Sequence, residues 1–116
     1  MQSYENLSVW KKAVALSVAI YKLSEKFPQK EVFGLTSQIR RAAVSVPSNI
    51  AEGRRRGTDA DFRNFLRMAH GSLAELETQL LITKELSYCS DIEYRKINTE
   101  AVEVSKMLQG LITKLR

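Results

Sequence analysis

The spacing of apolar residues is the feature that most constrains what this chain can fold into. Through four long segments these residues recur three or four positions apart, which places them along one side of an α-helix. Short breaks separate the segments at Pro28, at Gly57 and at Tyr88. Because short loops join antiparallel neighbours, the pattern predicts an all-α, antiparallel up-and-down four-helix bundle. At 116 residues the chain has the size of one domain, so we expect residues 1–116 to form a single bundle.

The first segment is predicted to be a helix from about Leu7 to Lys26, with Asn6 as its N-cap. It carries two adjacent apolar stripes. The first stripe consists of Val9, Ala13, Leu16, Ile20, Leu23 and Phe27, and the second of Leu7, Trp10, Val14, Val18 and Tyr21. An apolar face this wide exceeds what one packed layer of a monomer requires. The helix is therefore expected either to be central or to bury its second stripe against another subunit.

Four residues of the second stripe are candidate oligomer-interface residues: Trp10, Tyr21, Val14 and Val18. Large aromatic side chains dominate interface energetics, so the tryptophan and the tyrosine are the expected anchors. For either aromatic residue taken alone, an ordinary core position is the competing interpretation.

The second segment is predicted to be helical from about Leu35 to Arg56, although it contains a proline. Pro47 removes one backbone hydrogen bond and crowds the carbonyl of Ala43, at a cost of about 3 kcal/mol in a regular helix. We expect a kink there, with the freed backbone groups bonded by polar neighbours. These neighbours are Ser45, Ser48 and Asn49. A split into two helices at Pro47 is the alternative, and the continued apolar spacing favours one helix.

The third segment is predicted to begin after the N-cap Thr58 and to reach about Ser87. Its apolar repeat consists of Phe62, Phe65, Leu66, Ala69, Leu73, Leu76 and Leu80. A glycine inside a helix costs up to about 1 kcal/mol relative to alanine. Gly71, between Ala69 and Ser72, therefore suggests that another helix approaches closely at this point.

The fourth segment opens with a capping box, in which Ser90 is followed three residues later by Glu93. Its apolar residues form the narrow seam that is typical of a bundle helix. They are Ile97, Ala101, Val104, Leu108, Leu111 and Leu115.

Positive charge is concentrated in the second segment. Residues 36–57 carry a formal charge of +4, out of +5 for the chain. Residues 1–67 carry +6 and residues 68–116 carry −1. This asymmetry favours an anionic partner for the first half, and a solvated surface is the competing interpretation. Glu52, among the arginines, is expected to form an ion pair with one of them.

Arginine offers a planar fork of donors that matches phosphate oxygens. The candidate nucleic-acid-binding residues are Arg40, Arg41, Arg54, Arg55, Arg56, Arg63 and Arg67. Arg63, Arg67 and His70 share one helix face and would extend the basic surface if that face lay beside the second helix. No recognition helix, zinc finger or RNA-stacking aromatic motif is present in the sequence, so binding is expected to read backbone and shape.

The sequence holds no catalytic motif. His70 is the only histidine and Cys89 the only cysteine, so multi-histidine metal sites and internal disulfides are excluded, and no phosphate-binding glycine loop occurs. We expect no enzyme activity, no cofactor and no metal. The lone cysteine, the lack of a signal-peptide pattern and the lack of a long apolar run indicate a cytoplasmic protein without membrane contact.

Four stretches of the chain carry a resemblance to a known family. They are LSVWKKAVAL (7–16), IYKLSEKFP (20–28), FGLTSQIRRAAVSVPSNIAEGRRRG (33–57) and FRNFLRMAHGSLAELETQL (62–80). The sequence resembles the four-helix-bundle proteins encoded in intervening sequences of bacterial large-subunit ribosomal RNA genes. That resemblance implies a bundle that assembles into a ring, a pentamer, with a positively charged surface. The family is similar in fold to the accessory variability protein of diversity-generating retroelements, a pentamer that binds reverse transcriptase and nucleic acid.

Two functions remain open at this point. The first is an oligomer that binds the backbone of RNA or DNA through the arginine cluster. The second is a protein-interaction adaptor, for example for a retroelement reverse transcriptase, which the wide face of the first helix favours.

Overall fold

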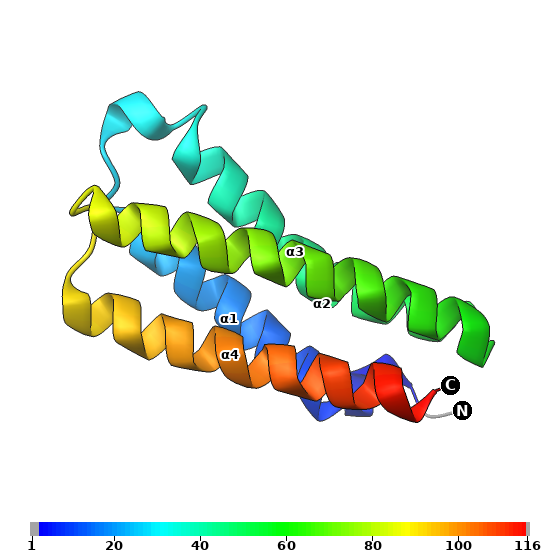
Figure 1. Ribbon diagram of the computed structural model, residues 1–116. Helices are drawn as coiled ribbons and strands as arrows, with labels where there is room; N and C mark the ends of the chain where they lie inside the picture. The colour runs from blue at the N-terminus through cyan, green and yellow to red at the C-terminus, as the bar shows by residue number, and fades with distance from the viewer. Residues whose placement is uncertain (1–2, 116) are drawn as a thin grey trace.

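The computed structural model describes residues 3–115, which fold into four antiparallel α-helices and two short 3-10 turns (Figure 1). The elements are η1 (Tyr4–Asn6), α1 (Ser8–Ser24), η2 (Gln29–Glu31), α2 (Leu35–Arg55), α3 (Asp59–Glu85) and α4 (Asp91–Lys114). Each helix packs against two others, and the pairs α1–α3 and α2–α4 lie diagonally across the bundle. No strand occurs within residues 3–115. The predicted all-α up-and-down bundle is confirmed.

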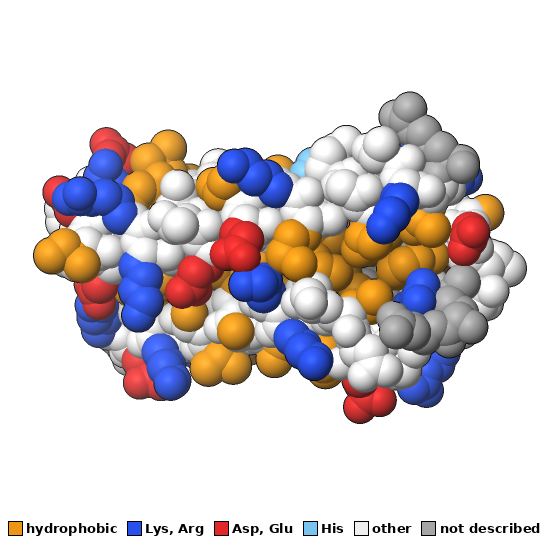
Figure 2. Space-filling model, turned by 90° about the horizontal axis from the view of Figure 1, so that it is seen from below, with side chains coloured by type: hydrophobic (Ala, Val, Ile, Leu, Met, Phe, Trp, Pro, Cys, Tyr) orange, Lys and Arg blue, Asp and Glu red, His pale blue; other side chains and the backbone are white. Residues whose placement is uncertain are grey.

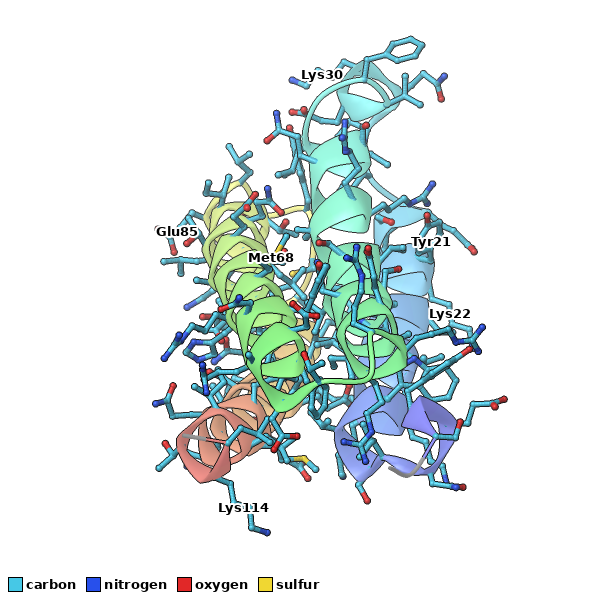
Figure 3. All side chains as sticks on the ribbon, turned by 90° about the vertical axis from the view of Figure 1, so that its right-hand side faces the viewer. Tyr21, Lys22, Lys30, Met68, Glu85 and Lys114 are labelled. Atoms are coloured by element: carbon cyan, nitrogen blue, oxygen red, sulfur yellow. The ribbon has the colours of Figure 1, made fainter. Side chains whose placement is uncertain are left out.

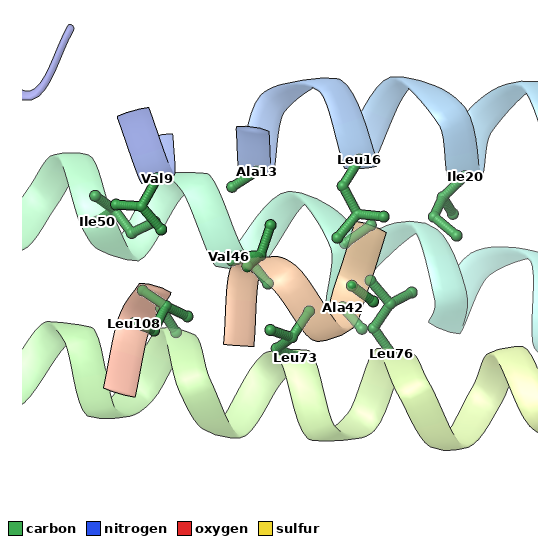
Figure 4. Close-up of a cluster of buried hydrophobic side chains, with 14 of the residues drawn as sticks. Val9, Ala13, Leu16, Ile20, Ala42, Val46, Ile50, Leu73, Leu76 and Leu108 are labelled. Atoms are coloured by element: carbon green, nitrogen blue, oxygen red, sulfur yellow. The ribbon is translucent and has the colours of Figure 1, made fainter. Parts of the chain in front are cut away.

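The core forms where the predicted stripes of the four helices meet. Figure 4 shows side chains from all four helices pointing toward one another. The whole first stripe of α1 is buried, as are Ile39, Val46 and Ile50 of α2. The predicted repeat of α3 is buried except for Phe65, which is half-buried. In the last turn of α4 the core position falls on Ile112, whereas Leu111 and Leu115 are half-buried.

Capping residues set the beginnings of the last two helices as predicted. Thr58 Oγ1 accepts a hydrogen bond from the N–H of Asp61 at 3.1 Å. Ser90 and Glu93 form both bonds of the capping box, at 2.9 and 3.1 Å. Gly57, which follows α2, has a φ of +90°, the left-handed conformation expected of a glycine after a helix.

The predicted N-cap of the first helix is wrong. Asn6 lies in the 3-10 turn η1, where its N–H donates to the carbonyl of Ser3. Leu7 is the residue that precedes α1, and its side chain makes no capping bond. Asparagine is a favoured N-cap residue on sequence grounds. Here Asn6 belongs to the preceding 3-10 turn, so the cap position falls on the next residue.

Helix α3 ends at Glu85, two residues before the predicted end. Ser87 adopts a φ of +60°. Its N–H donates to the carbonyl of Lys84, and the N–H of Tyr88 donates to the carbonyl of Thr83. This pair of bonds is a Schellman motif, built here on a serine where glycine is usual.

Pro47 lies inside one continuous helix, so α2 is not split. The carbonyl of Ala43, which Pro47 leaves without an N–H donor, accepts a hydrogen bond from Ser17 Oγ of α1 at 2.9 Å. The expectation that neighbours on α2 would fill this role is wrong. Asn49 instead bonds the carbonyl and hydroxyl of Ser45. A kink at Pro47 remains a prediction.

The tightest approach between α2 and α3 occurs at Gly53, and within the small-residue patch of Ala69, Gly71 and Ser72 the helices meet at Ser72 and not at Gly71. A Cβ atom on Gly71 would meet nothing within 4 Å, whereas one on Gly53 would lie 2.4 Å from the Cβ of Phe65. Close contact also occurs at Ser72, whose hydroxyl lies 2.8 Å from that of Ser45. Gly53 thus lets the end of α2 lie directly against the beginning of α3.

Candidate nucleic-acid interface

Three consecutive arginines at the end of α2 lie against aromatic rings. The close contact at Gly53 brings the rings of α3 next to the last turn of α2. The guanidinium carbon of Arg54 lies 5.0 Å from the centre of the Phe62 ring, and that of Arg56 lies 5.0 Å from the centre of the Phe65 ring. Positive charge in this last turn also suits the helix dipole, so local structure and ring contacts both hold the arginines in place.

The third arginine contacts a residue that sequence reasoning missed. The guanidinium carbon of Arg55 lies 5.5 Å from the centre of the Tyr4 ring in η1. Figure 3 shows η1 beside the turn between α2 and α3 at this end of the molecule. Tyr4 in turn meets the ring of Trp10 edge-on, with centroids 5.2 Å apart at 70°. The aromatic character of Tyr4 was visible in the sequence, but its position next to residue 55 was not.

A hollow of about 310 Å³ lies at this point, lined by Tyr4, Ala51, Glu52, Arg55 and Arg56. Glu52 Oε2 accepts from Arg56 Nη2 at 2.8 Å, which confirms the expected ion pair. Both side chains of this pair are about half exposed. The hollow therefore combines a ring, two guanidinium groups and one carboxylate at the surface.

The remaining arginines of α2 lie elsewhere. Arg41 and Arg54 are about 20 Å apart along the helix axis. Arg40 donates to Ser24 Oγ at 2.7 Å and to the carbonyl of Tyr21 at 3.4 Å, with its guanidinium over the Tyr21 ring. Arg40 thus joins α2 to the end of α1, and Arg41 is exposed beside it. The five arginines form two separate groups.

The basic face of α3 does not extend the arginine cluster of α2. Arg63 Nη1 donates to the carbonyl of Leu115 at 2.7 Å, and His70 Nε2 lies 3.1 Å from Ser105 Oγ. Both partners belong to the C-terminal half of α4 or its cap, so this face of α3 lies toward α4. The condition under which this face would extend the basic surface of α2 is therefore not met, and Arg67 is exposed.

The face formed by α1 and α4 carries charges of both signs (Figure 2). Lys12 and Glu103 form an ion pair at 2.7 Å, and Lys26 pairs with Glu93. The hydrogen bond from Lys26, together with the backbone N–H of Ser90, lowers the pKa of Glu93. These pairs border a groove of about 670 Å³ with an apolar lining that includes Leu23, Ile97 and Val104.

The chemistry of the rest of the chain is sparse. Burial raises the pKa of the Cys89 thiol, and the nearby carboxylate of Glu93 adds to the effect. The thiolate, which is the reactive form, is therefore disfavoured. Within residues 3–115 no group of three or more histidine, cysteine, aspartate or glutamate side chains is placed to hold a metal ion. None of the described helices is long and apolar enough to cross a membrane.

The candidate oligomer-interface residues of α1 differ in how far their side chains are exposed to solvent. Tyr21 is 43% exposed and Val18 49% exposed. Val14 is half-buried, and Trp10 packs partly against the core. The most exposed large apolar residue among those described is Phe33, at 95%, in the connection before α2. Sequence reasoning assigned Phe33 no role, because its exposure depends on how that connection stands away from the bundle.

The protein is thus a small, all-α four-helix bundle in which aromatic side chains contact a group of three arginines at one end. Nearly the whole chain, residues 5–110, matches the model of the 23S rRNA-intervening sequence protein family. The chain belongs to that family, which confirms the resemblance. It is similar to a solved protein of unknown function from the S23 ribosomal protein family of Bacteroides thetaiotaomicron, with 28% identity and a TM-score of 0.83. The similarity covers 90% of this chain and 97% of that one. No curated protein matches the chain.

Proposed function

We propose that this protein is a non-enzymatic, ring-forming oligomer that binds the phosphate backbone of RNA through arginines. The observation that carries the proposal is the group Arg54, Arg55 and Arg56, whose guanidinium groups rest on three aromatic rings at one end of the bundle. Side chains held in this way lose less conformational freedom when a ligand binds. Their planar donor forks match phosphate oxygens.

The charges of most of the candidate residues are not cancelled by carboxylates. Arg56 is paired with Glu52. Arg40 and Arg63 donate to neutral hydroxyl and carbonyl oxygens, which leave their charge in place. Within residues 3–115, Arg41, Arg55 and Arg67 form no ion pair. This supports a positively charged surface available to a polyanion.

Assembly would multiply this charge. A ring of five chains would carry a formal charge of +25, since each chain has +5. The pentamer is the assembly that the family resemblance implies, and the exposed Val18 and Tyr21 of α1 support a subunit contact on that side. Trp10 and Val14 are the further candidates. We place the protein in the cytoplasm on the basis of its single cysteine.

Binding of structured RNA over a salt series tests the proposal. If five arginines meet five phosphates of a duplex, log K should fall with log salt concentration with a slope of about −4.5. The variant Arg54→Gln/Arg55→Gln/Arg56→Gln should bind more weakly with a shallower slope. A matched control, Lys11→Gln/Lys96→Gln/Lys106→Gln, removes the same charge elsewhere and should bind more tightly than the arginine variant. Absent or salt-independent binding by the unaltered protein contradicts the proposal.

A second candidate function is a protein-interaction adaptor, for example for a reverse transcriptase encoded nearby. The observation that favours it is Phe33, whose exposed ring lies just before the start of α2, whereas the three arginines lie at the end of that helix. Aromatic side chains are enriched at the cores of protein interfaces. A partner that co-purifies through nuclease treatment and high salt, and is lost with Phe33→Ser, would support the adaptor. Loss of the partner on nuclease treatment would favour RNA binding.

A further inference from the structure

The hollow between η1 and the last turn of α2 has the chemistry of a nucleobase site. It is an open depression of about 310 Å³ at the surface, so a ligand would lie against one wall and keep its other side in solvent. A planar group that enters it would contact the ring of Tyr4 and the guanidinium groups of Arg55 and Arg56. Aromatic rings and guanidinium planes are the surfaces on which proteins stack unpaired bases.

The walls of the hollow are held in place before any ligand binds. Tyr4 packs edge-on against Trp10, which itself packs against the core. The turn that carries Tyr4 is closed by the hydrogen bond from the N–H of Leu7 to the carbonyl of Tyr4 at 3.0 Å. On the opposite wall, Arg56 is held by both Glu52 and the Phe65 ring. Such prior ordering lowers the cost of binding.

Polar groups at the hollow match a nucleotide. Glu52 contacts Arg56 through Oε2, so its second oxygen can accept a hydrogen bond from an N–H group at the edge of a base. Arg56 lines the hollow together with Arg55, so its guanidinium can meet a phosphate that flanks the base. A paired base cannot enter, because its two faces are covered by its neighbours in the helix.

We infer that this hollow binds the base of one unpaired RNA nucleotide on the surface that Tyr4 and Arg55 form together, with a flanking phosphate on Arg56. The inference rests on the proposed RNA-binding function and deepens it. A protein that contacts only the phosphate backbone has no need of unpaired bases. With this base site, the protein should bind single-stranded loops and ends of RNA more tightly than fully paired helices.

The test compares two single-stranded RNA oligomers of equal length, one with normal nucleotides and one with abasic nucleotides at every position. Both carry the same phosphates, so they differ only in the presence of the bases. Stacking of one base strengthens binding by about five-fold or more, and the protein should prefer the normal oligomer by at least that factor. Tyr4→Ala should bring the ratio of the two affinities close to one, with the salt slope unchanged. Tyr4→Phe keeps the ring and should keep the preference.

The outcomes separate this inference from the proposed function. Equal, salt-dependent affinity of the unaltered protein for both oligomers overturns the base site and leaves backbone binding in place. A preference for the normal oligomer that persists in folded Tyr4→Ala also overturns the site. No binding of either oligomer overturns both proposals. Far-UV circular dichroism establishes that the Tyr4 variants are folded, and Trp10, next to Tyr4, gives a fluorescence signal that should change on binding of the normal oligomer only.

Discussion

Replacing Ser17 by alanine removes a hydroxyl whose one hydrogen is shared between the carbonyl of Ala43, at 2.9 Å, and that of Ala13 in its own helix, at 3.0 Å. The Ala43 carbonyl lies in the core, next to a proline that has no N–H to offer. A buried acceptor left without a partner costs about 1–3 kcal/mol. Alanine recovers about 0.5 kcal/mol through its higher helix propensity. The free energy of unfolding should therefore fall by about 0.5–2.5 kcal/mol.

The same substitution should cost much less in a Pro47→Ala background. Without the proline ring, the backbone at this position would supply an N–H to the Ala43 carbonyl within α2, so Ser17 would no longer be needed. The coupling energy between the two sites should then be about 1–3 kcal/mol. Urea unfolding of the four proteins, followed by far-UV circular dichroism at one fixed protomer concentration, measures this value. Additive effects, within about 0.5 kcal/mol, would refute the assigned role of Ser17.

Four further outcomes are expected. In thermal melts, Gly53→Ala should destabilise the protein, because its new Cβ would lie 2.4 Å from a side-chain atom of α3. Gly71→Ala should instead stabilise the protein by up to about 1 kcal/mol, because its new Cβ would meet nothing within 4 Å and alanine favours the helix. The folded-state pKa of Glu93 lies below its ordinary value of 4.5, so its stabilising effect is present above that pH and is lost as the pH falls through the folded-state pKa. Denaturation midpoints measured at acid and neutral pH should therefore differ less in Glu93→Gln than in the unaltered protein. Glu52→Gln frees one arginine, and the salt slope for single-stranded RNA should steepen by about 0.7 in filter binding. Tyr21→Ala should lower the oligomer mass in light scattering, and an unchanged mass would remove this residue from the interface.

The parts of the fold that local rules determine could be predicted from the sequence. Thr58, Ser90 and Gly57 act on neighbours within three residues, so their roles follow from short patterns. The first stripe of α1 follows in the same way from helical spacing. These two kinds of signal were enough for the number of helices and for most of their boundaries.

The parts that depend on contacts between distant residues could not be predicted. Ser17 reaches Ala43 across two helices, and no local pattern marks that pair. Gly53 and Gly71 look alike in sequence, because the direction in which a helix turns its glycine is set by tertiary packing. For the same reason Tyr4, more than fifty positions from its arginine partner, could not be assigned to the site.

The four helices give the molecule two unlike poles, about 43 Å apart along its longest dimension. The start of α1, the end of α2 and the start of α3 meet at one pole, with their arginines and Tyr4, and the end of α4 lies there too (Figure 1). Phe33 precedes the start of α2 and so lies toward the other pole. A polyanion held at the first pole leaves the second accessible. The RNA-binding function and the adaptor function proposed above would therefore use different surfaces of the subunit.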